Sequence, residues 1–540
     1  MLAGVDHRLL RAGGAQRVDH RGGLDEVRPR PENVHDGCQH NFPSVHRGCL
    51  RSPAVPTKKP VYLAGLAWRQ VRDDPGRASR LAVRLLARTP FGARLRRSRF
   101  AVPKPRDVQR ETADLRRLLA HRPPSREPAS APSAPSALTT PSTRGVLQFV
   151  TNALPCTNAG YTVRTHRIAA AQREAGLDTH VVTRLGYPLS QGLGDARTRV
   201  DVEGVPYHRL LPWLPPGDPV RAVGRSADLA GGLVGELRPS VLHAVSNHLN
   251  AAVALELGRR HGLPVVYEVR GFLEDSWLSR DPSHSETDEF YRLTRELETR
   301  RMAEADAVVT LGEAMRAEIA SRGIPEEKIA VVPNGVDDAF LEPLPDPGDL
   351  RERLGIAADA AVVGLTSSFY GYEGIDTLID AAALLRDRGA PVTLLLVGDG
   401  PERPALERRA AGHGVHAVFT GRVPMESVRR FHAVLDVFAV PRRADRVCQL
   451  VTPLKPIEAM AGGIPVIASE VRALREIVEP GVTGALTVPE DPEAWANCLE
   501  GVAYSPERRQ KIGQAAREWV RAERTWRAVT AGYRTAYPFT

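Results

Sequence analysis

A short stretch near the C-terminus, VTPLKPIEAMAGGIPVIAS (Val451–Ser469), combines a cation, a carboxylate and the start of a helix. Pro456 suits the first turn of that helix, because proline has no amide hydrogen that would need a partner there. The unpaired amides and partial positive charge of a helix start attract phosphate, and Lys455 adds a cation. Glu458 falls in the same turn, where its carboxylate can accept two hydrogen bonds from a sugar diol. The stretch therefore predicts one site for the phosphates and the ribose of a nucleotide.

An isolated glutamate at this position would simply complement the helix dipole. The whole string TPLKPIEAMAGGIPVIAS, however, closely resembles the C-terminal motif of retaining glycosyltransferases with the GT-B fold, in the fourth sequence family of those enzymes. In that family the helix-start glutamate contacts the nucleotide ribose, so the resemblance implies this role for Glu458. It also implies that Lys455 and the amides near Thr452, Pro453 and Leu454 hold the phosphates.

The composition is that of a globular protein with a basic balance. The 540 residues are 42% hydrophobic and 25% charged, and the formal net charge is +9. A basic surface suits nucleic acid, anionic membrane or negatively charged substrates, and a solvated arginine-rich surface explains it equally well. The five cysteines show no metal-ligand spacing, so neither zinc nor a disulfide framework is indicated. Without a run of about 18 apolar residues or the apolar core of a secretory signal, we expect a cytoplasmic protein.

The first part of the chain, residues 1–143, is expected to be a basic extension. Its beginning has no sustained apolar periodicity and is rich in Gly, Pro, His and Arg, which indicates disorder. Helical spacing of leucines then predicts helices over Val61–Ala87 and Asp107–Ala120. We expect an accessory helical pair, with a basic hairpin on a membrane surface as the alternative. A Pro/Ser/Ala linker ends the extension.

Two α/β units are expected after the linker. Residues 144–337 open with an apolar strand, a glycine turn and a helix over Thr162–Ala175, which is typical of a doubly wound unit. The alternation of strands and helices starts again near Asp337 and continues through residues 338–515. The predicted strands are Val146–Asn152, Thr179–Arg184, Val241–Ser246, Pro264–Gly271, Ala307–Gly312 and Ile329–Gly335 in the first unit, and Ala361–Phe369, Val392–Gly400, His416–Val423, Val437–Arg442 and Pro465–Ser469 in the second.

The fold class that follows is α/β, with two Rossmann-like doubly wound domains facing a cleft, as in GT-B. Ligands of open α/β sheets bind at the carboxyl ends of the strands. The resemblance makes residues 144–337 the acceptor domain and residues 338–515 the nucleotide-sugar donor domain. It implies that residues 516–540, within a long helix over about Pro506–Tyr537, cross back onto the first domain.

The turn after the first strand, NAGYTVR (Asn158–Arg164), resembles a glycine loop found in a subgroup of these transferases. The resemblance implies that the backbone at Gly160 approaches the donor phosphates or the acceptor, with Tyr161 and Arg164 on the acceptor side. A tight strand-to-helix turn would also require a glycine, and the two interpretations are compatible.

Charged residues also follow a predicted buried strand at YEVRG, and Asp275 comes shortly after. Because unpaired buried charge is costly, we expect Glu268, Asp275 and, from the preceding strand, His243 to face the acceptor. Arg270 stands where many family members have histidine, and we expect it to take part in catalysis. The alternative is an internal ion pair between Glu268 and Arg270.

Two departures from the family pattern concern the donor site. Leu450 occupies the place of a glutamate that contacts the donor sugar, and Glu373 falls near the place of a phosphate-binding lysine. The resemblance also places Gly421, Arg422 and Val423 near the base. Lys455 could replace the missing cation, and Arg422, Arg442 and Arg443 are further candidates.

The expected function is a metal-independent, retaining transfer of a hexose from a UDP- or GDP-linked sugar to a glycan or lipid-linked glycan, in the synthesis of cell-surface polysaccharide or glycoconjugate. The leaving diphosphate would deprotonate the acceptor, so the enzyme's task is positioning and charge stabilisation. No metal, cofactor or nucleic acid partner is expected, whereas peripheral contact with the inner face of the cell membrane is. The alternatives are a non-hydrolysing nucleotide-sugar epimerase and a catalytically degenerate domain that binds a glycan or a protein partner. A dehydrogenase is a more remote third.

Overall fold

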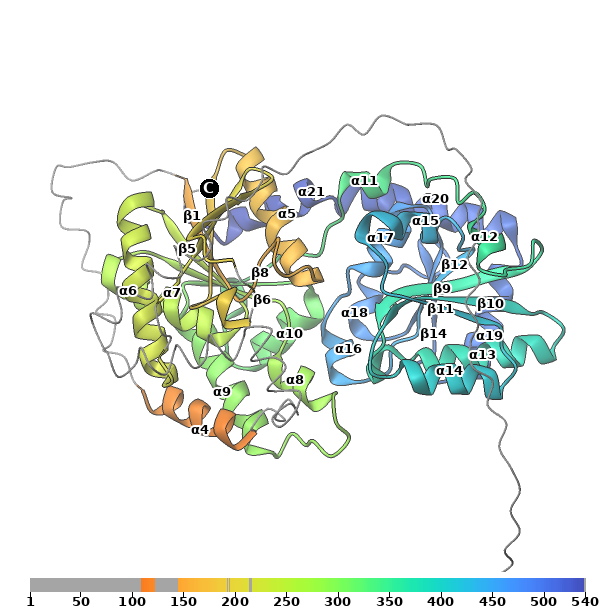
Figure 1. Cartoon of the computed structure of the whole chain (residues 1–540), viewed down its shortest axis with the longest axis horizontal. Helices are drawn as coiled ribbons and strands as arrows, with labels where there is room; N and C mark the ends of the chain where they lie inside the picture. The colour runs from red at the N-terminus through yellow and green to blue at the C-terminus, as the bar shows by residue number, and fades with distance from the viewer. Residues whose placement is uncertain (1–107, 122–143, 192, 194, 213–215, 539–540) are drawn as a thin grey trace, which may run out of the picture. The chain divides into compact units, whose positions relative to one another are not determined.

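The structure is a computed structural model that describes residues 108–121, 144–191, 193, 195–212 and 216–538. The expected helix over Val61–Ala87 and the linker after Ala120 lie outside the described residues. Within them the chain forms two α/β units, each built on its own sheet, and this confirms the predicted fold class (Figure 1).

The sheet of the first unit has eight strands in the order β3-β4-β2-β1-β5-β6-β7-β8, and only the β3–β4 pair is antiparallel. The chain moves from β1 to β2 on one side and later to β5 on the other, so the order reverses between β1 and β5. Such a reversal opens a crevice at the carboxyl ends of the strands. The strands are β1 (Gly145–Val150), β2 (Asp178–Thr183), β3 (Arg199–Val202), β4 (Val205–Arg209), β5 (Val241–Val245), β6 (Val265–Val269), β7 (Ala307–Thr310) and β8 (Ile329–Val331).

The sheet of the second unit has six strands, all parallel, in the order β11-β10-β9-β12-β13-β14. Its order reverses between β9 and β12. The strands are β9 (Ala361–Ser368), β10 (Val392–Asp399), β11 (Ala417–Gly421), β12 (Val437–Val440), β13 (Val466–Ser469) and β14 (Gly484–Thr487).

Three strands were missing from the sequence prediction: the β3–β4 hairpin and β14. The hairpin turns through Glu203 and Gly204, both with positive φ (47° and 79°), and its strands carry Arg, Asp, Pro and His among few apolar residues. β14 is four residues long and pairs only with β13. Such short edge elements lack the apolar runs that identify buried parallel strands.

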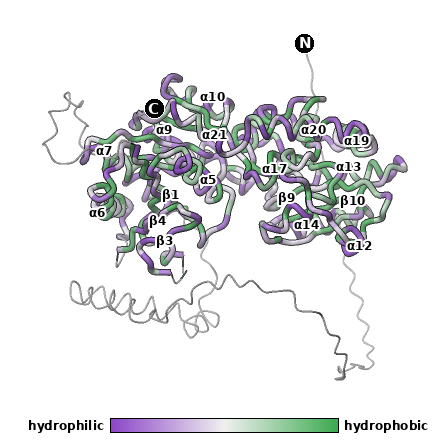
Figure 2. Tube along the Cα trace, turned by 90° about the horizontal axis from the view of Figure 1, so that it is seen from above, coloured by the Kyte–Doolittle hydropathy of each residue, from purple (hydrophilic) through white to green (hydrophobic). Residues whose placement is uncertain are grey.

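Helices cover the faces of both sheets (Figure 1). Along α13, α14 and α19, hydrophobic and hydrophilic residues alternate in Figure 2, as expected for helices with one buried face. The helices around the first sheet are α5 (Gly160–Glu174), α6 (Pro219–Leu237), α7 (His248–His261), α8 (Leu273–Leu278), α9 (Glu289–Glu304) and α10 (Glu313–Ser321). Those of the second unit are α11 (Asp338–Leu341), α12 (Leu350–Arg353), α13 (Ile375–Asp387), α14 (Arg403–Gly412), α15 (Val428–His432), α16 (Arg446–Leu450), α17 (Lys455–Ala461), α18 (Arg472–Arg475) and α19 (Pro492–Ala503).

Helix α4 (Val108–Ala120) belongs to the expected basic extension and packs on the first unit. Its Leu115 and Leu118 form a small apolar cluster with Leu297 of α9. Arg116 adds an exposed ion pair to Glu289, with 2.5 Å between Nη2 and Oε2. The last helix of the extension is therefore docked on the first α/β unit.

The C-terminal segment is two α-helices and a 3-10 turn, and not the single helix expected from the sequence. These elements are α20 (Pro506–Glu523), α21 (Trp526–Thr530) and η5 (Ala531–Thr535). The break falls where Val336 N donates to Arg524 O at 2.7 Å and Thr525 Oγ1 caps α21 by accepting from Ala528 N. Beyond the break, Trp526, Val529, Tyr533 and Tyr537 pack into an apolar cluster of the first unit.

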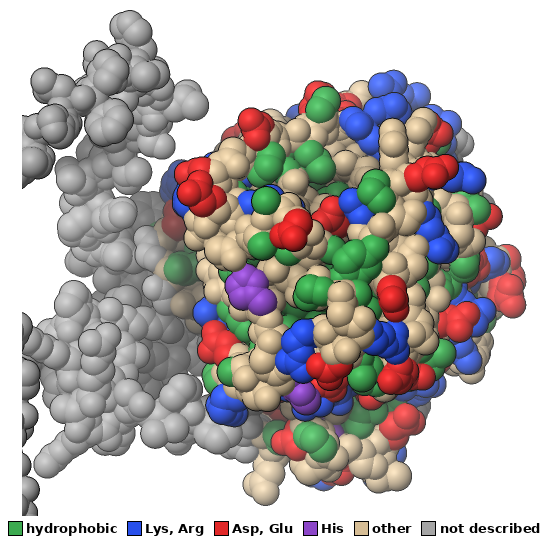
Figure 3. All heavy atoms as spheres, turned by 90° about the vertical axis from the view of Figure 1, so that its right-hand side faces the viewer, with side chains coloured by type: hydrophobic (Ala, Val, Ile, Leu, Met, Phe, Trp, Pro, Cys, Tyr) green, Lys and Arg blue, Asp and Glu red, His purple; other side chains and the backbone are tan. Residues whose placement is uncertain are grey.

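The surface that Figure 3 shows has acidic and basic side chains interspersed, without a large patch of one sign. In the part of the chain that the structure describes, every helix is too short or too polar to cross a membrane.

Candidate functional site

The predicted donor site lies at the start of α17. Glu458 is in its first turn and is 9% exposed. Its one ion pair among the described residues is with Lys455, with 3.4 Å between Nζ and Oε2. Burial raises the pKa of Glu458, Lys455 opposes this only in part, and Asp337 raises the pKa further. The carboxylate of Glu458 is thus shielded from water, and its single ion pair with Lys455 does not fully replace the lost hydration.

The first unit meets the second in front of this helix. A Cβ added at Gly160 would lie 3.2 Å from Leu454 Cδ1, and one added at Gly271 would lie 3.7 Å from Val451 Cγ2. Asn334, in the connection between the units, donates from Nδ2 to Thr452 O at 2.9 Å. The backbone from Val451 to Leu454 therefore lies against the glycine turn of the first unit.

The loops that follow β9 and β12 meet at the switch point of the second sheet. Gly374 (φ 67°) is packed so tightly that a Cβ would come 1.9 Å from Pro441 O. Glu373 pairs with Arg442 at 3.1 Å, and Arg442 also donates from Nη1 to Val451 O. Arg443 pairs with Asp376. Two of the predicted phosphate-binding cations are thus already held by carboxylates of this chain.

Gly421 is the last residue of β11, an edge strand of the second sheet, and Arg422 and Val423 follow it. Gly421 has φ 73°, a conformation that favours glycine. Arg422 is exposed, and Val423 packs against a small apolar cluster that contains Val397. Among the described residues no hydrogen bond or ion pair joins this segment to Glu458, so its contact with the base stays a prediction.

A second group of predicted site residues forms a buried network around Glu268. Arg164 donates to Glu268 Oε1 from Nε and Nη2 at 3.0 and 2.9 Å. Arg270 binds both carboxylate oxygens, at 2.9 and 3.0 Å. Tyr533, from the C-terminal segment, donates to Oε2 at 2.9 Å. Burial raises the pKa of Glu268, but the two arginines and His243 outweigh it and hold that pKa well below its usual range.

His243 belongs to the same network. Its Nε2 lies 3.1 Å from Glu268 Oε2, and its Nδ1 lies 2.9 Å from Tyr537 Oη. Burial lowers the pKa of His243 despite the neighbouring carboxylate. His243 and Glu268 are both fully buried and Arg164 is 2% exposed. The internal ion pair between Glu268 and Arg270, considered as the alternative from the sequence, is present in the structure.

The remaining acceptor-side residues lie in different settings. Tyr161 is 45% exposed, and its hydroxyl accepts from Asn152 Nδ2 at 2.7 Å. Asp275 is buried and pairs with Arg446 of α16, whose guanidinium also reaches Glu318 at 2.6 Å. Of the two, only Tyr161 presents a large free surface.

The two halves of the chain match two family models. Residues 159–335 match the model described as "Glycosyl transferase 4-like domain", and residues 360–503 match "Glycosyl transferases group 1". Each α/β unit of the chain therefore matches one glycosyltransferase domain family, and the two units have the GT-B fold. The two matched ranges lie on either side of Asp337, where the sequence predicted the division.

The chain spans only part of the length of the curated relatives that it matches. A GDP-mannose-dependent alpha-(1-6)-phosphatidylinositol monomannoside mannosyltransferase of Mycolicibacterium smegmatis is 34% identical over 238 residues, which is 43% of this chain and 62% of the relative. A D-inositol 3-phosphate glycosyltransferase of Geodermatophilus obscurus is 34% identical over 260 residues, which is 44% of this chain and 54% of the relative. The match therefore spans between about half and two thirds of each relative.

Solved structures agree with the fold. Sucrose-phosphate synthase from Thermosynechococcus elongatus superposes with a TM-score of 0.59 at 20% identity, covering 73% of this chain and 98% of the other. HepE of Anabaena in complex with UDP gives a TM-score of 0.55 at 20% identity, covering 72% and 97%. At such identities the likeness concerns the fold alone.

Leu450, a departure from the family pattern, is 3% exposed and belongs to the apolar cluster of the first unit. It lies at the end of α16, the same helix whose Arg446 pairs with Asp275. Helix α16 therefore docks on the first unit through both an apolar and a charged contact.

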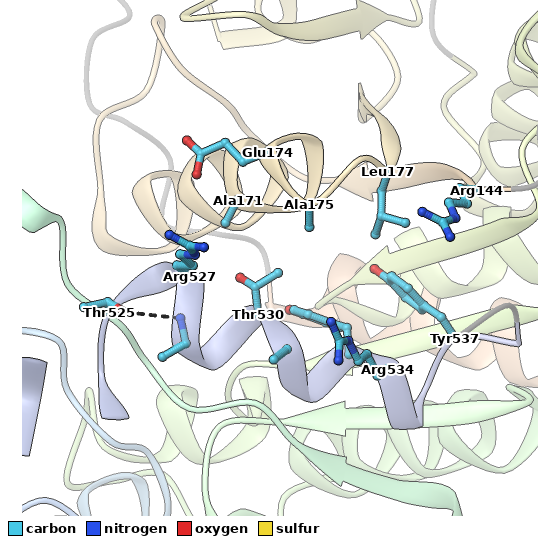
Figure 4. Close-up of a pocket in the computed structure, with 13 residues that line it drawn as sticks. Arg144, Ala171, Glu174, Ala175, Leu177, Thr525, Arg527, Thr530, Arg534 and Tyr537 are labelled. Atoms are coloured by element: carbon cyan, nitrogen blue, oxygen red, sulfur yellow. Dashed lines mark hydrogen bonds between the residues drawn. The ribbon is translucent and has the colours of Figure 1, made fainter. Parts of the chain in front are cut away.

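Another cavity of the described residues lies away from this site. About 1010 Å³ in volume, it lies between the end of α5 and the C-terminal segment and is lined by Arg144, Glu174, Arg527 and Arg534, among others (Figure 4). Arg144 immediately precedes β1, so this cavity is at the amino edge of the sheet. Ligands of open α/β sheets bind at the opposite edge.

Four residues of this site were missing from the sequence prediction. Tyr533 and Tyr537 contact Glu268 and His243 across more than 260 positions. Arg446 and Asn334 join the two units. No local spacing connects residues so far apart, and only the strand order brings them together.

Proposed function

We propose that this chain is a retaining glycosyltransferase that transfers a hexose from a nucleoside-diphosphate sugar, UDP- or GDP-linked, to a glycan or lipid-linked glycan. The observation that carries the proposal is the approach of Gly160 to Leu454, which places the first unit against the helix that bears Glu458. The name of one relative, a GDP-mannose-dependent mannosyltransferase, supports a nucleotide-sugar donor.

In this proposal Glu458 accepts hydrogen bonds from the ribose. Its buried carboxylate, with a single cation 3.4 Å away, gains most when a ligand supplies further donors. Lys455, whose side chain is 35% exposed, turns toward the diphosphate and stabilises the charge of the leaving group. Arg422, exposed and without an ion pair among the described residues, is the second candidate cation.

Catalysis then rests on positioning and on charge stabilisation, with the departing diphosphate accepting the proton of the acceptor hydroxyl. We propose that no metal is needed. Among the described residues no group of three or more His, Cys, Asp and Glu has the arrangement of a metal site. Transfer measured with and without EDTA tests this, and a loss of turnover that Mg²⁺ or Mn²⁺ restores would refute it.

Membrane contact and a role in cell-surface glycan synthesis are part of the same proposal. The relative from Mycolicibacterium smegmatis is named for a phosphatidylinositol-linked substrate, and such an acceptor would bring the enzyme to a membrane surface. Sedimentation with anionic vesicles at low and high salt tests this, since electrostatic attachment is lost at high salt.

The decisive experiment measures donor binding by calorimetry with UDP-, GDP- and ADP-sugars, using the wild type and Glu458→Ala. We expect one donor class to bind, and the variant to lose at least about tenfold in affinity, which corresponds to about 1.4 kcal/mol. An unchanged affinity in the variant would refute the role of Glu458. Arg225→Gln, on the exposed face of α6, is the control and should bind donor like the wild type.

A catalytically degenerate domain that binds a glycan or a partner is the second candidate. It is favoured by two observations: Leu450 is buried in the apolar cluster of the first unit, and Glu373 pairs with Arg442 at the place of a phosphate-binding cation. Nucleotide binding without turnover, over many donor and acceptor pairs, would support this alternative.

A further inference from the structure

A second cavity lies at the carboxyl edge of the first sheet, on the same edge as the Gly160 turn. It has a volume of about 200 Å³ and is lined by the ends of β1, β2 and β4 and by the first turns of α6 and α7. The cavity lies on the β1, β2 and β4 side of the sheet, at the carboxyl ends of its strands, which is the edge where open α/β sheets bind ligands.

The wall of this cavity is apolar. Most of it comes from side chains that belong to the core of the first unit or pack against it: Phe149, Val182, Leu185, Leu210, Val223 and Val253. Leu249, at the first turn of α7, also lines the cavity and is 37% exposed. An exposed leucine beside an open apolar cavity favours an apolar ligand group, because burial of such a group removes both surfaces from water.

One charged side chain, Arg184, lines the cavity. Its Nε is buried without a hydrogen-bond partner, and no ion pair joins its guanidinium to another described residue. Burial lowers the pKa of Arg184, and the neighbouring Tyr161 and Tyr187 oppose this shift. A partly buried guanidinium whose Nε has no acceptor is stabilised by an anionic partner, which it can bind through two parallel hydrogen bonds.

Hydrogen bonds link the cavity to the Gly160 turn. Asn250, which lines it, donates from Nδ2 to Thr151 Oγ1 at 3.0 Å and to Val245 O at 2.7 Å. The next residue, Asn152, holds the hydroxyl of Tyr161, and Tyr161 follows Gly160 directly. The cavity, Arg184 and the Gly160 turn therefore lie next to one another at the carboxyl edge of the first sheet.

We propose that this cavity binds the apolar portion of the acceptor and that Arg184 binds an anionic group next to it. The acceptor is thus an anionic amphiphile, with its apolar chain in the cavity and its head on the rim near Tyr161. The volume of about 200 Å³ is smaller than the 300–1,000 Å³ of typical ligand pockets, so it takes one end of the ligand. The inference rests on the proposed glycosyltransferase function and specifies its acceptor class.

The test is calorimetric binding of three probes to the full chain, each below its micelle concentration: octyl phosphate, octyl glucoside and inorganic phosphate. Octyl phosphate is expected to bind at least about tenfold tighter than the other two probes. Only octyl phosphate has both an apolar chain for the cavity and an anionic group for Arg184. Equal binding of octyl phosphate and octyl glucoside would overturn the role of Arg184. Equal binding of octyl phosphate and inorganic phosphate would overturn the role of the cavity.

Two variants address the two parts of the site. Arg184→Gln should reduce octyl phosphate affinity to that of octyl glucoside, and Ala222→Phe, which fills the cavity from α6, should abolish the binding of both octyl compounds. Arg225→Gln makes the same change of charge outside the cavity and should have no effect. Wild-type octyl phosphate affinity in either cavity variant would overturn the proposal.

Donor binding separates this inference from the proposed function. Each variant should bind the nucleotide-sugar donor like the wild type, which also shows that it is folded. If the donor binds and octyl phosphate does not, the acceptor class is wrong and the transferase function stands. If no donor binds to the wild type, the proposed function itself fails.

Discussion

Two glutamates of this chain are buried, yet their surroundings differ. Glu268 is fully buried and receives hydrogen bonds from Arg164, Arg270 and Tyr533. Glu458 is 9% exposed and has one ion pair, 3.4 Å from Lys455. Burial raises the pKa of both, but the partners of Glu268 hold its pKa well below the usual range, whereas that of Glu458 stays raised. A buried charge with all its partners supports the fold, and one that lacks partners is available to a ligand.

Removal of the Glu268 carboxylate is expected to have the largest effect on stability. Glu268→Ala leaves Arg164 and Arg270 as buried charges without a counter-ion, and breaking such a buried pair costs about 3–5 kcal/mol. The free energy of unfolding from urea titrations, followed by tryptophan fluorescence, measures the loss.

Glu458→Ala is the matched variant for this comparison. It should change the free energy of unfolding by less than about 1 kcal/mol, because only one long ion pair is lost. If Glu268→Ala were as stable as the wild type and had lost transfer activity instead, the network would serve the acceptor and the comparison would be wrong.

Glu274 sharpens the comparison, because it is a buried glutamate with too few partners that lies outside the proposed donor site. Burial raises its pKa to about 7, in spite of the ion pair with Arg322 at 2.7 Å. Between pH 4.5 and 7 the folded protein therefore holds a proton that the unfolded chain has lost. Its contribution makes stability fall as pH rises through this window, by up to about 1.4 kcal/mol per pH unit.

The measurement is the free energy of unfolding at several pH values from about 4.5 to about 7.5, which span the two pKa values. Glu274→Gln removes the titrating group and should make the pH profile flatter than that of the wild type. Parallel profiles for the two proteins would show that Glu274 titrates normally.

Donor binding should report the raised pKa of Glu458. The ribose needs the carboxylate form, so donor affinity should fall as pH decreases toward that pKa, earlier than for an ordinary glutamate. Calorimetric titrations from about pH 5 to about pH 8 measure this, and the limiting decrease is about tenfold per pH unit. Glu458→Gln should bind weakly with no such dependence, and a wild type without pH dependence would contradict the raised pKa.

Much of the fold could be predicted from the sequence. The eleven predicted strands all exist, because each is a run of apolar residues that a parallel sheet buries on both faces. The helix predicted over Thr162–Ala175 agrees with α5 (Gly160–Glu174) within two residues at each end. The β3–β4 hairpin and β14 were missed, because these short strands carry no such apolar run.

The site was harder to predict. The start of α17 followed from local residue types, since a proline, a carboxylate and a cation within one turn together favour a helix start that binds an anionic ligand. The role of Glu268 did not follow, because its partner Tyr533 lies 265 positions away. Arg184 was also missed, since its lack of partners is a property of the folded chain.

The smallest expected effect concerns the contact between the glycine turn and the donor helix. Gly160→Ala places a Cβ 3.2 Å from Leu454 Cδ1, the end of a flexible side chain that can shift by a few tenths of an ångström. The free energy of unfolding should change by less than about 0.5 kcal/mol. Donor affinity should fall by about threefold, which corresponds to about 0.7 kcal/mol of binding free energy. Gly232→Ala, in α6 with open space around the new methyl group, is the control.

A double-mutant cycle makes this last prediction specific. Leu454→Ala removes the atom that the new methyl group would meet, so Gly160→Ala should have no effect on donor affinity in that background. A persistent loss would mean that the methyl group blocks the donor itself. No loss in either background would mean that the glycine turn and the donor helix do not close on the ligand together, and the approach of Gly160 to Leu454 would then carry no function.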